Sequence, residues 1–274
     1  MTTRRELLDT FEADYKTPAL CRTIGSRIFP TMAFYARVWG VVLRESERAR
    51  GGHFGHPAWR DAAHAVSRAF ELGGVPICFE NLDVLGRFDE PCVIIGNHMS
   101  TAETFILTRW LLRYRPVTYV VKQGLVEYPV FKHIMRACNP IVVGRKDPRQ
   151  DLRTVMGEGM EHLKKGTSVI IFPQKTRASE FIPEEFNSIG VKLANRAGVP
   201  VLPLALKTDA WSNGKRLKEF GPFYNDRPVH LALGEPMPVT GNGKEQNDAI
   251  VSFIQEKLAS WEKWDAQWKE ARGV

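Results

Sequence analysis

The sequence lacks the features that mark zinc-binding, exported and membrane-spanning proteins. Its 274 residues include four cysteines, Cys21, Cys78, Cys92 and Cys138, which are far apart and show no CxxC spacing. We interpret them as reduced thiols of a cytosolic protein and expect no metal site. No apolar run reaches the ~20 residues that a membrane-spanning helix needs. The N-terminus, MTTRRELLDTFEADYK, lacks the apolar stretch of a secretion signal, so export is not expected.

The sequence also lacks the signatures of serine hydrolases and of nucleic-acid-binding proteins. The motif GxSxG, which surrounds the serine nucleophile of many hydrolases, is absent. Lysine and arginine exceed aspartate and glutamate by 38 to 31, which gives a net charge of +7. The basic residues are scattered, however, and no helix-turn-helix, zinc-finger or RNP motif is present. We therefore expect a partner such as anionic lipid or a phosphorylated substrate, and no nucleic acid.

From residue 91 onward the chain alternates short β-branched runs with segments of helix length. The pattern predicts strands at 92–95, 117–121, 140–143, 168–172, 200–206 and 230–233, and helices at 101–114, 127–138, 151–165 and 185–197. Gly166 and Gly198 stand where two of these helices should end. Such alternation predicts an α/β fold with a mostly parallel central sheet flanked by helices.

Two helical segments are expected on either side of this α/β part. The first ninety residues read as helical, and the apolar stretch 28–43 either lies in a membrane interface, with Arg37 reaching outward, or packs as an ordinary core helix. Trp261, Trp264 and Trp268 recur at helical spacing within 247–269, for which we favour packing on the core. We divide the chain into an N-terminal helical arm at 1–74, an α/β domain at 75–240 and a C-terminal amphipathic helix at 241–274.

Three polar loops follow predicted strands. GNHMSTAE comes after the strand at 92–95, GRKDPR after the one at 140–143, and PQKTRAS after the one at 168–172. In open α/β sheets, ligands bind at the carboxyl ends of the strands. We therefore expect one edge of the sheet to carry His98, Glu103, Arg145, Gln174, Lys175 and Arg177.

The first loop has two interpretations. Ser100 and Glu103 fit an S-x-x-E capping box, in which the serine caps a helix and the glutamate binds the amide of the cap residue. A capping box accounts for Glu103 without any catalytic role, but it does not account for Asn97 and His98, which precede the cap residue. Alternatively, His98 is a general base, and the carboxylate of Glu103 fixes its tautomer and stabilises the imidazolium that forms.

The other two loops are basic. Arg145 and Arg177 can each offer forked donors to a phosphate group, with Lys175 as a point charge. The alternative is that each is a solvated loop charge with little effect. Two basic loops beside one histidine favour a site for an anionic substrate.

Together these loops resemble the motifs of the glycerophospholipid acyltransferases, the 1-acylglycerol-3-phosphate acyltransferase family. NHMSTAE resembles the first motif, NPIVVGRKD the second, FPQKTRAS the third and VPVLPLAL the fourth, in the family's order, over roughly residues 75–235. Three positions depart from the family pattern. Glu103 replaces an aspartate, Gln174 replaces a glutamate, and Lys175 replaces a glycine, so we expect a phosphorylated or more anionic acceptor.

The resemblance implies an acyltransferase that moves a fatty acyl group from acyl-CoA or acyl carrier protein to a lysophospholipid hydroxyl. It implies His98 as the base and Glu103 as its partner, and it needs no metal or bound cofactor. The residues implied in substrate binding are Asn97, Arg145, Gln174, Lys175, Thr176 and Arg177. It also implies peripheral association with the cytoplasmic face of a membrane. The altered third motif leaves open a non-catalytic lipid-binding protein on the same fold.

Overall fold

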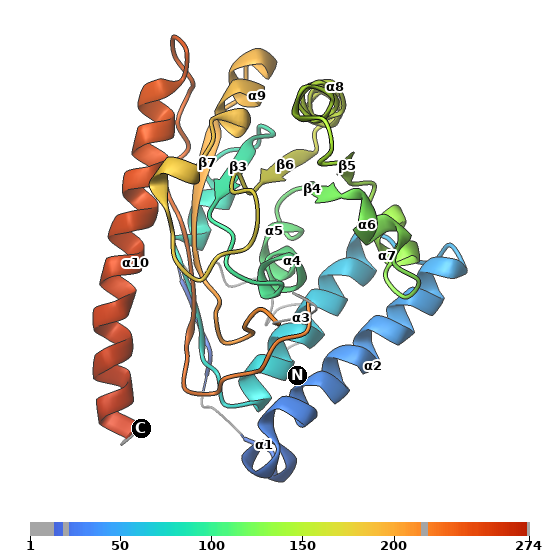
Figure 1. The fold of residues 1–274 in the computed structure, drawn as a ribbon, viewed down its shortest axis with the longest axis vertical. Helices are drawn as coiled ribbons and strands as arrows, with labels where there is room; N and C mark the ends of the chain where they lie inside the picture. The colour runs from blue at the N-terminus through green and yellow to red at the C-terminus, as the bar shows by residue number, and fades with distance from the viewer. Residues whose placement is uncertain (1–13, 19–21, 215–218, 273–274) are drawn as a thin grey trace, which may run out of the picture.

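An eight-stranded sheet forms the centre of the molecule (Figure 1). The computed structural model describes residues 14–18, 22–214 and 219–272. The strand order is β1-β2-β8-β7-β3-β6-β4-β5. The strands are β1 (Tyr15–Lys16), β2 (Ile77–Glu80), β3 (Val93–Gly96), β4 (Val117–Lys122), β5 (Ile141–Val143), β6 (Ser168–Ile171), β7 (Val201–Lys207) and β8 (Val229–Leu233).

Strands β7, β3, β6, β4 and β5 run parallel to one another. Strand β8 is antiparallel to β7, and β2 is parallel to β8. The carboxyl ends of the five parallel strands therefore meet at one edge of the sheet, where their loops can form a shared site.

Helices cover both faces of the sheet because side chains alternate along its strands. Ile94 and Ile170 point into one hydrophobic core, while Val93, Ile95 and Val169 point into the other. The first core also receives side chains from α2–α7, and the second from α8–α10. The helices are α1 (Ile24–Ile28), α2 (Pro30–Arg50), α3 (His56–Leu72), α4 (Ala102–Ile106), α5 (Thr108–Leu111), α6 (Gln123–Glu127), α7 (Lys132–Ala137), α8 (Pro148–Lys164), α9 (Ile189–Ala197) and α10 (Lys244–Arg272).

The predicted fold class is confirmed. The six predicted strands occur within one residue of their expected bounds, and Gly166 and Gly198 adopt positive φ angles at the ends of α8 and α9. The expectation that the first ninety residues are helical is wrong, because β1 and β2 lie within them. The helix predicted at 101–114 is two short ones, α4 and α5. The one predicted at 127–138 is shortened to α7, because Pro129 disfavours a helical conformation at Tyr128.

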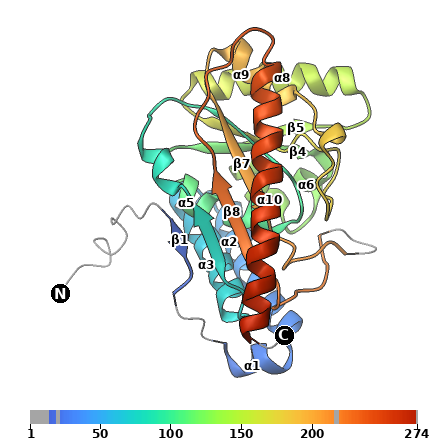
Figure 2. The same cartoon turned by 90° about the vertical axis from the view of Figure 1, so that its left-hand side faces the viewer.

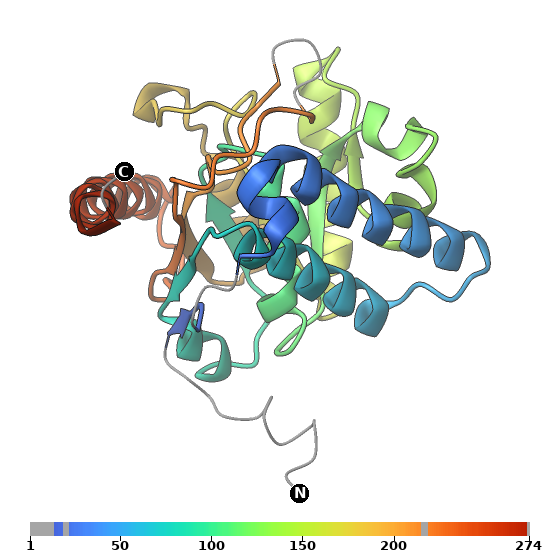
Figure 3. The same cartoon turned by 90° about the horizontal axis from the view of Figure 1, so that it is seen from below.

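The N-terminal helices α2 and α3 lie side by side against the first core (Figures 1 and 3). Arg37 does not reach outward, since its guanidinium donates to the hydroxyls of Thr23 and Ser26 around α1. Residues 1–13 and Cys21, which belong to the predicted arm, lie outside the described residues. Within the described part of the chain, no helix has the length and apolar character needed to span a bilayer.

The C-terminal helix α10 lies along β7 on the other face of the sheet (Figure 2). Ile250, Ile254 and Trp261 are buried against the sheet, whereas Trp264 remains partly exposed. The apolar stripe predicted from the sequence therefore packs on the core. Of its tryptophans, Trp261 is buried and Trp264 is exposed. The proposed division of the chain into three segments remains a prediction.

Candidate functional site

The end of β3 is fixed against β7 by its last residues. A Cβ atom on Gly96 would lie 2.8 Å from the carbonyl oxygen of Leu204, so only glycine allows this close approach. The side chain of Asn97 donates to the carbonyl of Leu206 at 2.7 Å and accepts from its N–H at 2.8 Å. These contacts determine where the chain leaves the sheet and thus where His98 stands.

Glu103 is fully buried and every partner of its carboxylate is a donor. Oε1 accepts from the backbone N–H groups of Met99 and Ser100 at 2.8 and 2.9 Å, and from the Thr208 hydroxyl at 2.7 Å. Oε2 lies 2.5 Å from Nδ1 of His98. A buried carboxylate with this many donors is oriented without freedom to rotate.

The loop contains contacts that each of the two interpretations requires. The bond from the Ser100 amide to Glu103 is the one that a capping box provides. The Ser100 hydroxyl, however, accepts from Ala102 and contacts Thr208 rather than capping the amide of residue 103. One oxygen of Glu103 thus organises the start of α4, and the other holds His98.

His98 is held at its backbone and at its ring. Its N–H donates to Oε1 of Gln174 at 2.7 Å, and its carbonyl accepts from the N–H of Ala178 at 3.0 Å. Its imidazole stacks on Phe172, with ring centroids 4.5 Å apart and planes at 5°. Because Nδ1 faces Glu103, Nε2 is the ring nitrogen that can exchange a proton with a substrate. The side chain is 18% exposed, and His98 lines the cavity described below.

The residues expected to bind substrate fall into two groups. Asn97 and Gln174 are buried and bind backbone groups, so their amides fix the two loops around His98. Arg145, Thr176 and Arg177 line the cavity described below. Lys175 is exposed and is not among the lining residues, although its carbonyl accepts a hydrogen bond from the Arg145 guanidinium.

Arg145 and Arg177 differ in their surroundings. Arg145 has a positive φ of 57°, and its N–H donates to Asp151 at 2.9 Å, so the loop after β5 is tightly turned. Arg177 is largely buried and contacts the Thr101 hydroxyl and, at 2.9 Å, Glu219. Arg145 is therefore the more exposed cation, whereas Arg177 is already partly neutralised.

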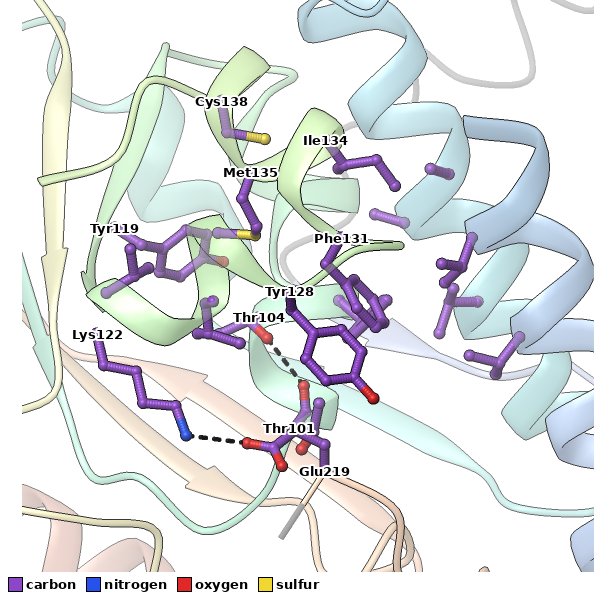
Figure 4. A pocket seen from close by; sticks show the side chains of 18 of the residues that line it. Thr101, Thr104, Tyr119, Lys122, Tyr128, Phe131, Ile134, Met135, Cys138 and Glu219 are labelled. Carbon is purple, nitrogen blue, oxygen red and sulfur yellow. Dashed lines mark hydrogen bonds and ion pairs between the residues drawn. The ribbon is translucent and has the colours of Figure 1, made fainter. Parts of the chain in front are cut away.

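Glu219 also pairs with Lys122, at 3.1 Å (Figure 4). Partial burial raises the pKa of Glu219, but hydrogen bonds from its own backbone and from Lys122 outweigh burial and lower the pKa below its ordinary value. The carboxylate is therefore ionised at neutral pH. Lys122 and Arg177 pair with Glu219, and Arg145 also lines the cavity, so this end of the site keeps a positive balance that suits an anion.

A cavity of about 320 Å³ begins beside His98 and extends between the sheet and the helix pair α2 and α3. Figure 4 shows polar residues such as Thr101 and Lys122 at one end, and Ile134 and Met135 of α7 at the other. Apolar side chains of α2 and α3, among them Val42, complete the second end. The site therefore joins an ionic mouth to an apolar interior, which matches an amphiphilic molecule.

Several site residues were not identified from the sequence. Thr208 lies two residues after the strand predicted at 200–206, so its position near the carboxyl edge was a usable signal. Phe172 and Tyr119 had been assigned to buried strands, and nothing in the sequence distinguished their place in the cavity wall. Nothing in the sequence indicated that Glu219 belongs to the site.

Among the described residues, no cluster of three His, Cys, Asp or Glu side chains is placed to bind a metal ion.

The fold and this site define an α/β protein with a histidine–carboxylate pair at the carboxyl end of a central parallel strand. Residues 47–207, more than half of the chain, match the family model described as Acyltransferase. The chain belongs to this acyltransferase family, as the resemblance of its motifs implies.

Similar proteins include two curated relatives. The chain is 32% identical over 176 residues to a 1-acyl-sn-glycerol-3-phosphate acyltransferase of Pseudomonas aeruginosa, a match that covers 62% of this chain and 65% of the relative. It is 31% identical over 166 residues to the chloroplastic 1-acyl-sn-glycerol-3-phosphate acyltransferase BAT2 of Brassica napus, covering 61% of this chain and 45% of that one. Each match spans less than two thirds of the relative's length.

A solved structure has the same fold. The crystal structure of the 1-acyl-sn-glycerophosphate (LPA) acyltransferase PlsC from Thermotoga maritima superposes with a TM-score of 0.63 at 22% identity. The match covers 86% of this chain and 95% of that chain. It therefore includes most of the elements that surround the His98 site.

Proposed function

We propose that this protein transfers a fatty acyl group from acyl-CoA or acyl carrier protein to a free hydroxyl of a lysophospholipid that resembles 1-acylglycerol-3-phosphate. The observation that carries the proposal is the pair of His98 and buried Glu103 at the ionic mouth of an apolar cavity. Membership of the acyltransferase family and the names of the curated relatives support the same chemistry.

The pair accounts for the proton movements of such a reaction. Glu103 keeps the proton of neutral His98 on Nδ1, so the lone pair of Nε2 can remove the proton from the acceptor hydroxyl. The hydroxyl oxygen then attacks the thioester carbonyl and forms a tetrahedral oxyanion. As this intermediate collapses, the C–S bond breaks and the leaving thiolate takes the proton from the imidazolium.

The ionic mouth and the apolar interior would bind different parts of the substrates. Arg145 and Arg177 would hold the acceptor phosphate, because a guanidinium can donate two parallel hydrogen bonds to it. The acyl chain would occupy the interior, where apolar side chains replace water. No cofactor is required in this scheme, since the donor is itself a substrate.

Product formation tests the proposal directly. Purified protein is incubated with labelled acyl-CoA or acyl carrier protein and with a set of lysophospholipids that differ in headgroup. We expect a diacyl product with at least one donor, fastest with the acceptor whose phosphate is a monoester. Tight binding of lysophospholipids without turnover with either donor would instead support a non-catalytic lipid-binding protein.

We further propose that the protein works at the cytoplasmic face of a membrane, as its amphiphilic substrates require. Four neighbouring apolar side chains are exposed around α1 and the start of α2: Ile24 at 77%, Ile28 at 63%, Phe29 at 61% and Met32 at 71%. Arg27 adds a positive charge that suits anionic headgroups. This patch lies at one end of the molecule, far from α8 and α9 (Figure 2).

Changing both Phe29 and Met32 to glutamate is expected to weaken vesicle binding at least about tenfold, because two apolar contacts are lost and two repulsive charges are added. The measurement is co-sedimentation with phosphatidylglycerol vesicles. Leu152→Glu, at an exposed position of α8, is the matched control and should bind as the unmodified protein does. Equal binding by all three proteins would contradict a membrane contact at this patch.

A further inference from the structure

The end of β7 is held from both faces of the sheet. On one face, the hydroxyl of Thr208, which directly follows the strand, donates to Oε1 of Glu103 at 2.7 Å. On the other face, Nζ of Lys207 donates to Oδ2 of Asp265, which belongs to α10. Successive side chains of an extended chain point in opposite directions. A contact that α10 makes with Lys207 therefore also affects where Thr208 points.

Asp209, on the other side of Thr208 along the chain, is held by ion pairs as well. Its carboxylate lies 3.2 Å from Nη1 of Arg227 and 3.5 Å from Nζ of Lys207. Thr208 itself is fully buried between these two anchored residues. Neither Lys207 nor Asp209 is among the residues that line the cavity. The position of the Thr208 hydroxyl thus depends on groups outside the cavity.

Asp265 is a buried carboxylate with a partner on each oxygen. Its side chain is 9% exposed and that of Lys207 is 15% exposed. Oδ1 lies 2.7 Å from Nε2 of His230, which is itself buried. Burial raises the pKa of Asp265, but the hydrogen bonds from His230 and Lys207 outweigh burial and lower the pKa below its ordinary value. The carboxylate is therefore charged at neutral pH.

Such an ion pair is a poor way to hold a helix if stability is all that it provides. Removing two charges from water costs about as much as their attraction returns, so apolar side chains would serve at least as well. α10 has such side chains, since Ile250 and Ile254 are buried against the sheet along which it lies (Figure 2). Hydrogen bonds, unlike apolar contacts, have a required direction. The contact between Asp265 and Lys207 therefore fixes a position.

We propose that Asp265 is a positioning residue for the proposed catalytic pair. Through Lys207 it holds Thr208 in place, and the Thr208 hydroxyl in turn orients Glu103. The C-terminal helix would thus act on His98 without contacting it. This inference rests on the proposed function, because it takes His98 and Glu103 to be the groups that move the proton.

A double-mutant cycle tests whether Asp265 acts through Thr208. Asp265→Asn removes the charge that holds Lys207, and Thr208→Val removes the hydroxyl with little change of shape. Each should lower kcat by about three- to tenfold, the effect of one weakened hydrogen bond. KM for donor and acceptor should change little, because neither residue lines the cavity. The double variant should lose no more than Thr208→Val alone, since no hydroxyl is left to position.

Glu80→Gln is the matched control, because it also changes an acid that joins α10 to the sheet into its amide. Glu80 is in β2 and accepts from Nζ of Lys257 and, at 2.7 Å, from Nε1 of Trp261. This variant should lower the free energy of unfolding, as Asp265→Asn does, but it should leave kcat unchanged. The measurements are initial rates at saturating substrates and denaturant unfolding curves for each protein.

Arg227→Gln provides a second variant in case Asp265→Asn does not fold. It releases Asp209 on the other side of Thr208, and its side chain is 34% exposed, so the fold should persist. We expect kcat to fall in the same way, and again no further in combination with Thr208→Val.

The outcomes separate this inference from the proposed function. Full kcat in folded Asp265→Asn and Arg227→Gln proteins would overturn the inference and leave the acyltransferase intact. Losses that multiply with that of Thr208→Val would also overturn it, since the anchors would then act by another route. No turnover by the unmodified protein would contradict the proposed function, and the inference with it.

Discussion

Replacing His98 by alanine is expected to reduce kcat for acyl transfer by about 10²- to 10⁴-fold, the usual contribution of a general base. The acceptor hydroxyl would then have no group to take its proton during attack on the thioester. The fold should persist, because Glu103 keeps its hydrogen bonds from Met99, Ser100 and Thr208. Initial rates at saturating donor and acceptor, together with a circular dichroism spectrum, provide the measurement.

A suitable control is His162→Ala, which removes a half-buried histidine in the last turn of α8, away from the cavity. It should leave kcat unchanged. If His98→Ala retains the full rate in a folded protein, then His98 is not the base and the proposed mechanism fails.

Glu103→Gln is expected to cause a loss of similar size, about 10³- to 10⁴-fold in kcat, for a reason that the hydrogen bonds make explicit. The glutamine oxygen can still accept from Met99, Ser100 and Thr208, which leaves the side-chain NH₂ facing Nδ1 of His98. Nδ1 must then act as acceptor, so the ring proton moves to Nε2. A histidine protonated on Nε2 cannot take the proton of the acceptor.

Stability measurements distinguish this effect from loss of a helix cap. Glu103→Gln should lower the free energy of unfolding by about 1–2 kcal/mol, since its remaining hydrogen bonds no longer involve a charge. Ser100→Ala should also cost about 1 kcal/mol, because it removes a hydroxyl that accepts from the N–H of Ala102 and shares a hydrogen bond with the Thr208 hydroxyl. Only Glu103→Gln should lose most of the rate. If both variants lose stability alone, Glu103 serves the helix and not the histidine.

The sequence was sufficient to predict the strands that build the site. The segments 92–95 and 168–172 are rich in β-branched residues, and 200–206 is a short apolar run, so their type was evident. β2, Ile77–Glu80, was missed because two of its four residues are only partly buried, so it lacks the continuous apolar run of β3 and β6. The break before α7 had a local cause, Pro129, which disfavours a helical conformation at Tyr128.

General rules of sheet geometry predicted which loops form the site, but not the contacts within it. That polar loops after parallel strands share an edge was enough to bring His98, Arg145 and Arg177 together. The groups that orient them could not be predicted, because they come from distant parts of the chain. Gln174 illustrates this: a change of charge in the third motif suggested an altered acceptor pocket, yet its side chain binds the backbone of His98.

The same distant contacts affect how the protein can be made. The bonds from Thr208 to Glu103 and from Leu206 to Asn97 join residues 105 and 109 positions apart. During synthesis His98 and Glu103 therefore leave the ribosome well before the strand that orients them exists, and contacts of this range form late in folding. A nascent chain that ends before β7 would have both side chains of the proposed catalytic pair but not the contacts that orient them. The proposed acyl transfer would thus begin only when nearly the whole α/β sheet has been assembled.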